Sequence, residues 1–445
     1  MWGISGSVTC ALLRDFAPPR ASSWRRVFFY LKEAYIPLSG DRTSRALLLA
    51  ILSWLMLFSQ QISMNTQLHR AVCLHSQGCI FVPSQFDCAV SSMDEEELAM
   101  QTNRTLRLDR CRDAGVDPDF LLQWELGIIL EGHQSAPRFR VPDYPSVEAH
   151  FDRAAEEIDR ITAEGKIHWF PQGEEPDDLD IAPSTLIIRN ARMRMVHDWT
   201  RAGLNECLVV PEMVSDTLDI LINQLRPNCH VAGLDIRDCF LHWPIHRSCR
   251  HRLGVRHPWT GRLGVYLFLP PGLGPAPGIN ESHVSEIVRV AIKHMPLAVC
   301  RYVDDLRILN TAALPPHEDK LLLDTQLKCL KERLEHLGMR IHDKAGKLIP
   351  ATQTIEWLGW RISTTEMSVS LTPEKTQKGQ WLCMDLLRRA QQHSPIRAKD
   401  VMSVAGFLNF VATVIHTGKP YIKSLLQGTA MAEVYAAWQN GRQRF

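Results

Sequence analysis

The sequence predicts an α/β (α+β) fold built around a ferredoxin-like core. A short apolar run ends at Asp235, and two further apolar runs, 297–300 and 306–309, flank an acidic pair and read as a hairpin. One segment at helical spacing lies before this hairpin and another lies after it, ahead of a last apolar run at 339–342. Strand, helix, hairpin, helix, strand is the order of the split β-α-β motif.

Apolar stripes define the helices. The segment 282–295 carries one stripe, and the segment that ends before Gly338 carries another with leucines at alternating spacings of four and three. A helix is predicted over 151–165, ending on Gly165, and two more over 372–390 and 398–426. We expect the stripes to pack in the core; they are Val284, Ile287, Val288, Ala291, Ile292 and Met295, then Leu323, Leu327, Leu330, Leu334 and Leu337.

Acidic residues fall at two strand ends. Asp304 and Asp305 lie at the tip of the predicted hairpin, and Asp235 directly follows a strand-like run. Adjacent carboxylates on a tight turn repel each other unless a cation neutralises them, although an acidic turn is most often a solvated turn. A third carboxylate on a neighbouring strand favours a Mg²⁺ site, because two-metal phosphoryl transfer needs carboxylates that bridge two cations.

The motifs in this order resemble those of the polymerase domain of retroelement reverse transcriptases. LDIRDCF (234–240), the Pro/Gly-rich loop LPPGLGPAP (269–277) and YVDD (302–305) match the first three catalytic motifs, and 336–363 resembles the fourth and fifth. The tract 242–277 is similar to that of the long-terminal-repeat, pararetroviral and tyrosine-recombinase (DIRS-like) branches. The resemblance covers residues 145–430, about two thirds of the chain.

The resemblance implies a right-hand polymerase with a ferredoxin-like palm, fingers and a helical thumb. Fingers would span 146–230, the palm 231–365 and the thumb or connection 366–430, with a poorly defined region at 1–145 and a tail at 431–445. The implied reaction is attack of a primer 3′-OH on a dNTP, templated by RNA or DNA. Its cofactors would be two Mg²⁺ ions, with Mn²⁺ as the alternative.

The resemblance also assigns roles to single residues, which fall into three groups. The catalytic, metal-binding residues would be Asp235, Asp304 and Asp305, of which Asp305 is the more replaceable. The dNTP would contact Arg194, Asp238, Phe240, Pro271, Gly272 and Lys344, with Phe240 as the steric gate against a ribose 2′-OH, Arg189 as a weaker basic contact and Lys347 as a competitor of Lys344. Primer and template would contact Tyr302, Val303, Trp357, Leu358, Gly359 and Trp360. Without this resemblance, Phe240 reads as an ordinary core aromatic.

Some residues depart from the family pattern. Pro271 stands where Gln or Phe is usual, and Asn280 where an aromatic residue is common. A proline changes the shape of its loop because its φ is fixed and it lacks an N–H. Arg301 and Arg307 bring charge to strands that are usually apolar, and would either reach the primer backbone or strain the palm.

Composition agrees with an intracellular globular protein in the cytoplasm or nucleus, without a trusted targeting signal. The net charge is only +1, but six arginines and four histidines against Asp238 alone lie between Arg237 and Arg262, a tract suited to a template backbone. Cysteines form no C-x-x-C pair, so neither a zinc knuckle nor a disulfide framework is indicated. The acidic runs 94–97 and 174–180 predict exposed loops.

The apolar run 46–58 favours a buried or partner-facing helix over a membrane anchor, because a membrane span needs about 20 residues. Expected partners are a primed template and dNTPs, and RNase H and recombinase or integrase modules of the same element on other chains, for which no room is expected here. A second reading is a decayed or domesticated scaffold that binds nucleic acid without catalysis. An RNA-dependent RNA polymerase is disfavoured by Phe240.

Overall fold

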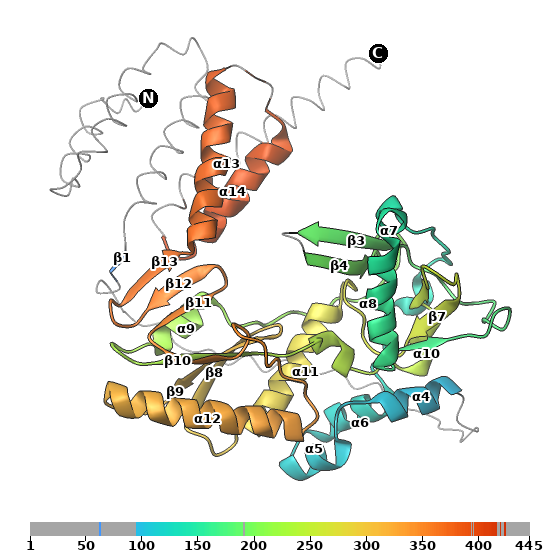
Figure 1. Ribbon diagram of the computed structural model, residues 1–445, viewed down its shortest axis with the longest axis horizontal. Helices are drawn as coiled ribbons and strands as arrows, with labels where there is room; N and C mark the ends of the chain where they lie inside the picture. The colour runs from blue at the N-terminus through green and yellow to red at the C-terminus, as the bar shows by residue number, and fades with distance from the viewer. Residues whose placement is uncertain are drawn as a thin grey trace, which may run out of the picture. The chain divides into compact units, whose positions relative to one another are not determined.

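The computed structural model describes residues 62–63, 95–189, 192–392, 394, 396–415, 419, 422 and 423. The apolar run 46–58 and the tail 431–445 lie outside them. The chain divides into two compact units (Figure 1), one formed by Ile62–Ser370 and a second to which α13 and α14 belong. No helix of the described residues is long and apolar enough to cross a membrane.

The predicted ferredoxin-like core is confirmed. A four-stranded antiparallel sheet, here called the palm sheet, has the order β10-β5-β9-β8. Along the chain its elements follow as strand, helix, hairpin, helix, strand, which is the split β-α-β order. They are β5 (Val231–Asp235), α11 (Ala276–Ala291), β8 (Leu297–Tyr302), β9 (Asp305–Asn310), α12 (Pro316–His336) and β10 (Ile349–Thr352).

The last strand of this core does not lie where the sequence predicts it. The predicted strand 339–342 forms only one isolated bridge, between Ile341 and Ile236, and β10 supplies the fourth strand instead. Met339 and Ile341 are buried, which explains the strand-like alternation. Among the described residues, the backbone of this segment bonds to the end of β5 and to the residues just after it, since His342 N donates to Asp235 O at 3.0 Å and Arg237 N donates to Arg340 O at 2.8 Å.

The predicted apolar stripes lie in the core. Leu323, Leu330 and Leu334 are fully buried on α12, which packs against β5, β9, β10 and α11 (Figure 1). Helix α12 ends at His336, two residues before Gly338, whose φ of +100° is a conformation that favours glycine. Helix α11 begins at Ala276, earlier than the apolar stripe indicates. Pro277 is tolerated in its first turn because an N–H group there has no partner within the helix.

The first unit also contains short helices and two small sheets, whose elements lie both before and after β5 in the sequence. The β3–β4 hairpin stands alone as a two-stranded sheet, and a three-stranded sheet has the order β2-β7-β6. Helix α8 ends at Ala163, just before Gly165 at φ +66°, as its sequence predicts. The elements are α4 (Glu95–Asn103), α5 (Leu108–Ala114), α6 (Pro118–Leu126), η1 (His133–Ser135), α7 (Pro145–Ala149), α8 (Phe151–Ala163), β2 (Ile167–Trp169), β3 (Ser184–Arg189), β4 (Arg192–His197) and α9 (Leu218–Gln224), with η2 (Cys239–His242), α10 (Arg247–Arg250), β6 (Gly254–Arg256) and β7 (Leu263–Tyr266) after β5.

The acidic runs are not simply exposed loops. Glu95, Glu96 and Glu97 form the first turn of α4, where carboxylates favour the helix dipole, and Glu97 pairs with buried Arg250 at 3.0 Å. Asp180 is fully buried between Arg138, at 2.7 Å, and Arg252, at 2.5 Å. Single acids within these charge runs therefore form ion pairs with arginines from distant segments.

A second four-stranded sheet follows the palm sheet, in the order β1-β13-β12-β11. Its strands are β1 (Ile62–Ser63), β11 (Thr354–Trp357), β12 (Trp360–Ser363) and β13 (Ser368–Leu371). In the second unit, α13 (Pro373–Gln391) and α14 (Ala398–Val411) form a helical pair. Thr372 caps α13 by accepting the Lys375 N–H at 3.4 Å.

Candidate active site

The three predicted carboxylates meet at one end of the palm sheet. Asp235 is the last residue of β5 and lies directly opposite Asp305, the first residue of β9, in the antiparallel register. Asp304 precedes β9, and its carbonyl accepts the Ile236 N–H at 2.8 Å. Residues 70 positions apart in the sequence are therefore neighbours on adjacent strands.

The turn that carries Asp304 is tight and strained. Tyr302 pairs with Asp305, which leaves Val303 and Asp304 as the two central residues of the hairpin. Val303 has a φ of +59°. A positive φ at the first central position alone is the arrangement of a type II′ turn, which normally takes glycine there, and a β-branched residue with positive φ is a conformational outlier. The backbone around Asp304 is thus held in a costly shape.

Two cationic side chains neutralise the carboxylates. Lys347 pairs with Asp235 Oδ2, and Arg307 pairs with Asp305 Oδ1. Arg307 is 5% exposed and crosses β5 at Gly233, where a Cβ would lie 2.9 Å from its Nη1. Glycine at this position therefore gives the guanidinium room to reach Asp305. The sequence leaves open whether Arg307 reaches toward a primer backbone or points into the palm, and its side chain points inward.

Negative charge remains concentrated at the site despite these cations. Burial, with Asp235 nearby, raises the pKa of Asp304 above its ordinary value. Burial also raises the pKa of Asp305, and Asp235 adds to this, although Arg307 acts in the opposite direction. Ionised carboxylates are therefore unfavourable here, and a bound cation would favour their charged form.

The residues present fit divalent cations in charge and donor type. Asp235 Oδ1 is buried and accepts no hydrogen bond from the described residues, with His342 Nε2 3.5 Å away. Carboxylate oxygens are the donors that Mg²⁺ and Mn²⁺ prefer. As they stand, no three or more His, Cys, Asp or Glu side chains of the described residues are gathered closely enough to hold a metal ion. Asp235, Asp304 and Asp305 are the residues that would hold such ions.

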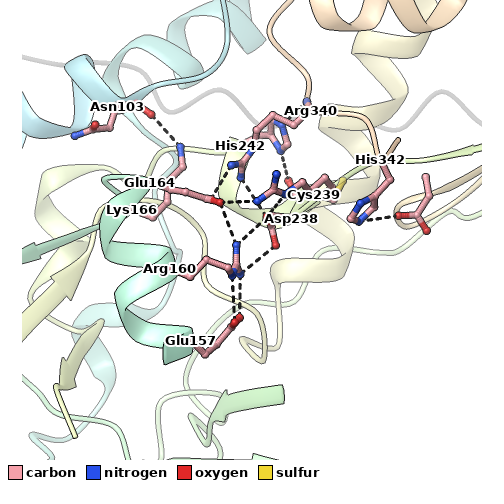
Figure 2. Close-up of polar contacts among 12 residues, drawn as sticks. Asn103, Glu157, Arg160, Glu164, Lys166, Asp238, Cys239, His242, Arg340 and His342 are labelled. Carbon is pink, nitrogen blue, oxygen red and sulfur yellow. Dashed lines mark hydrogen bonds and ion pairs between the residues drawn. The ribbon is translucent and has the colours of Figure 1, made fainter. Parts of the chain in front are cut away.

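A cluster of arginines and acids surrounds Asp238 (Figure 2). Asp238 has a φ of +48° and pairs with Arg160 at 3.1 Å, Arg237 at 3.3 Å and Arg340 at 3.5 Å. Glu164, at the end of α8, joins all three arginines, at 3.1, 2.9 and 2.6 Å respectively. The cluster ties the loop after β5 to α8 and to the segment after α12, and it fixes the backbone that follows Asp235.

Two buried bases adjoin this cluster. Burial, with Arg340 nearby, lowers the pKa of Lys166 to about 7, and Lys166 Nζ donates to Asn103 O at 2.9 Å. His242 Nε2 accepts the Arg340 N–H at 2.9 Å, and burial lowers its pKa to about 3. His242 is therefore neutral at neutral pH and acts here as an acceptor.

Asp238→Asn should reduce stability at neutral pH and lose this effect in acid. Burial alone would raise the pKa of Asp238, but Arg160, Arg340 and Arg237 outweigh it and hold the pKa below its ordinary value. The stabilisation is therefore full above the unfolded pKa of about 3.9 and disappears as pH falls through the lower folded value. Urea unfolding from pH 7 to pH 3 should show wild type and variant converging below about pH 4. Glu156→Gln, which removes an exposed pair with Arg153, should show no such trend.

Phe240 packs against the core, and the Pro/Gly-rich loop is held by Trp199 and Asn205. Phe240 is half-buried in η2, five positions after Asp235. Trp199 Nε1 donates to Pro271 O at 3.3 Å, and Asn205 bonds Gly272 O at 3.1 Å and the Gly274 N–H at 2.8 Å. Gly272 has a φ of +95°, so the loop turns where glycine is favoured. The dNTP contacts of Phe240, Pro271 and Gly272 stay predictions.

The predicted phosphate contacts Arg194 and Arg189 lie on the β3–β4 hairpin. Arg194 is exposed on β4, opposite Ile187, and the backbone of Arg189 on β3 lies opposite that of Arg192 on β4. Lys344 is exposed, whereas Lys347 is the lysine that touches Asp235. Lys347, given as the competitor by the sequence, is therefore the better placed of the two beside the carboxylates.

The predicted primer-binding hairpin is formed by β11 and β12. Trp357 and Trp360 pair across it and are 1% and 2% exposed, so their rings are not on the surface. Leu358 and Gly359, at φ +50° and +83°, make a two-residue turn that is half-buried. Among the residues predicted to contact primer and template, Tyr302 is exposed.

Several residues of the site lack a signal in the sequence. Arg160 and Glu164 come from a helix with no motif, and Arg340 has no assigned role within the segment that resembles the fourth motif. Only the fold brings the three to Asp238. Glu281, which accepts the Val303 N–H at 3.2 Å, reads as a polar helix residue. Arg307 and Asn280 are visible as departures from the family pattern, but their partners are not.

No known protein family and no curated protein matches the sequence. Solved structures similar to the chain include three of the foamy viral protease-reverse transcriptase. One of them, in complex with dsDNA, is 17% identical to this chain with a TM-score of 0.46. The match covers 77% of this chain and 69% of the foamy viral chain. The dRH form with dsDNA is 17% identical with a TM-score of 0.47, and the match covers 78% of this chain and 62% of the other. The form with an RNA/DNA hybrid is 16% identical with a TM-score of 0.47, and the match covers 79% of this chain and 48% of the other. In the last two, the chain spans less than two thirds of the matched protein.

Proposed function

We propose that this chain is an RNA-directed DNA polymerase of a retroelement. The observation that carries the proposal is the meeting of Asp235, Asp304 and Asp305 at one end of a ferredoxin-like sheet, where Asp235 and Asp305 are directly paired. Motifs that resemble those of reverse transcriptases supply these same residues. The reaction is the transfer of a nucleotide from a dNTP to a primer 3′-OH, with pyrophosphate as the leaving group.

The side chains have distinct tasks in this reaction. Asp235, Asp304 and Asp305 hold the divalent cations, which when bound activate the attacking oxygen and stabilise charge on the leaving one. Arg194 binds triphosphate oxygens through its guanidinium. Lys347 lies beside Asp235 and offsets charge on the departing pyrophosphate, a task that Lys344 shares from the same loop.

The further partners follow from the same proposal. The chain acts on a primed RNA or DNA template inside the cell, in the cytoplasm or nucleus. RNase H and recombinase or integrase modules of the same long-terminal-repeat, pararetroviral or DIRS-like element work on other chains. The arginine-rich tract from Arg237 to Arg262 gives only partial support for template binding, because Arg250 and Arg252 are buried in ion pairs.

A second candidate is a scaffold that binds nucleic acid without catalysis. The pairing of Asp235 with Lys347 and of Asp305 with Arg307 favours it, because these carboxylates already have cationic partners in the chain itself. The two candidates differ in turnover alone, so only a reaction separates them.

Primer extension tests the proposal. Purified protein is given a poly(rA)/oligo(dT) duplex, dTTP and Mg²⁺ or Mn²⁺, beside Asp304→Asn. Extension by the wild type that the variant lacks would establish the polymerase with its site at residues 302–305. A folded protein that binds the duplex but extends no primer in either metal would favour the scaffold.

Phe240→Ala should weaken the selection of deoxynucleotides. A bulky ring beside the sugar collides with a 2′-OH, so its removal admits ribonucleotides. We expect the ratio of kcat/KM for dTTP to that for UTP to fall at least about tenfold. Phe240→Tyr keeps the ring and should keep the ratio; an unchanged ratio in the alanine variant would return Phe240 to the role of a core aromatic.

A further inference from the structure

The strained turn of the predicted catalytic hairpin is bonded on both sides by neighbouring residues of one helix. Asn280 Nδ2 donates to Val303 O at 3.1 Å, and Glu281 Oε2 accepts the Val303 N–H at 3.2 Å. Asn280 and Glu281 belong to α11 and are 0% and 3% exposed. Both peptide groups of the residue with positive φ are thereby fixed by buried side chains.

The orientation of Asn280 follows from its other partners. Its Oδ1 accepts from Trp243 Nε1 at 2.8 Å and from Cys239 Sγ at 3.0 Å. An indole nitrogen only donates, so the amide oxygen must face Trp243 and the amide nitrogen must face Val303. Asn280 therefore joins η2, the element that follows Asp235, to the turn that carries Asp304.

Glu281 has a similar double attachment. The same oxygen that accepts the Val303 N–H also accepts from Ser215 Oγ at 3.0 Å, and Glu281 Oε1 is buried without a hydrogen bond. Burying a carboxyl group costs free energy unless hydrogen bonds or ion pairs compensate for the lost water. The bonds that it does make are directed at the turn and at the segment ahead of α9.

We propose that Asn280 and Glu281 form a clamp that holds the unfavourable backbone conformation of Val303 and so positions Asp304 for the reaction. The inference rests on the proposed function for its catalytic consequence. Its structural part stands apart from it, because a turn with positive φ at a β-branched residue relaxes unless surrounding contacts over-determine it. Both residues act through the turn and are positioning residues.

The test compares Glu281→Met with Glu281→Gln. The glutamine can keep an oxygen for Val303 and Ser215, and the methionine cannot. Glu286→Met is the matched control, since Glu286 is also a buried acid of α11 but accepts from Asp117 N at 2.8 Å and pairs with Arg289, away from the turn. Hydrogen–deuterium exchange of peptides covering 300–306 reports the Val303 amide, and single-turnover extension at saturating duplex reports the rate.

In Glu281→Met, we expect exchange at 300–306 to rise at least about tenfold and the extension rate to fall at least about tenfold, with duplex affinity unchanged. Glu281→Gln and Glu286→Met should keep both values near those of the wild type. Exchange that is unchanged in Glu281→Met, or raised equally in Glu286→Met, overturns the clamp. If the wild type extends no primer, the exchange result still decides the clamp, while the proposed function fails separately.

Two further variants keep the proposal testable if Glu281→Met does not fold. Asn280→Asp retains the acceptor for Trp243 and Cys239 but removes the donor to Val303, and it should raise exchange at 300–306 in the same way. Val303→Gly removes the strain, so adding it to a clamp variant should restore the extension rate to within about fivefold of wild type. A double variant no faster than the clamp variant alone contradicts the role of strain.

Discussion

Asp235→Asn is expected to lower the single-turnover rate of primer extension by at least about 10³-fold, equivalent to about 4 kcal/mol of transition-state stabilisation. Asp235 ends the central strand of the palm sheet, and its Oδ1 is buried without a hydrogen bond. The amide keeps the shape of the side chain but removes the charge that would hold a cation. Circular dichroism and duplex affinity should remain those of the wild type.

Asp305→Asn should be much milder, at about tenfold, because Asp305 is partly exposed and is held by the buried guanidinium of Arg307. Asp235, in contrast, is buried and pairs with the more exposed Lys347. Asp343→Asn serves as the control, since Asp343 is an exposed acid of the nearby loop that pairs with Lys331. An Asp305→Asn variant as inactive as Asp235→Asn would contradict this ranking of the carboxylates. Equal activity of Asp235→Asn and wild type would contradict the proposed site itself.

Arg307→Met is expected to lower the free energy of unfolding by about 2–3 kcal/mol, the lower range for a buried pair because Asp305 is partly exposed. Removing the guanidinium leaves Asp305 without a partner beside Asp235 and Asp304. It also removes the donor to Leu306 O and Glu356 O, each at 3.0 Å. Thermal unfolding should move down by roughly 4–10 °C.

The double variant Asp305→Asn, Arg307→Met separates charge from packing. Breaking one partner of a buried pair costs more than replacing both, so the double variant should be more stable than Arg307→Met. Divalent cations should also stabilise Arg307→Met more than wild type, because they replace the missing positive charge and bind only the folded chain. A single variant as stable as the wild type, or a double variant less stable than the single one, would show that the pair does not hold this hairpin.

The core of the fold can be predicted from the sequence because its signals are local. Leucines of α12 and the stripe on α11 repeat at helical spacing, and the carboxylates mark the strand ends. The fourth strand is mispredicted because Met339 and Ile341 are buried alternately as in a strand, while their segment makes a single isolated bridge at the end of β5 and β10 pairs along the strand. Periodicity reports burial and does not report hydrogen-bond partners.

The meeting of Asp235, Asp304 and Asp305 can be predicted from the sequence, because each lies beside the end of an apolar run that predicts a strand. Their catalytic role stays a prediction. The partners of Arg307, Asn280 and Asp238 could not be found, because each contact joins segments that are distant in sequence. Such pairs depend on register and on helix packing, which a single sequence does not encode locally.

The antiparallel order β10-β5-β9-β8 also constrains how the molecule is made. Strand β5, with every residue buried, leaves the ribosome long before β9 and β10, the strands that cover its two edges. Until then an apolar strand presents unpaired N–H and C=O groups, which is the arrangement most prone to aggregation during synthesis. A nascent chain that pauses between residues 310 and 349 has one of these edges open, so its solubility depends on how quickly translation passes this interval.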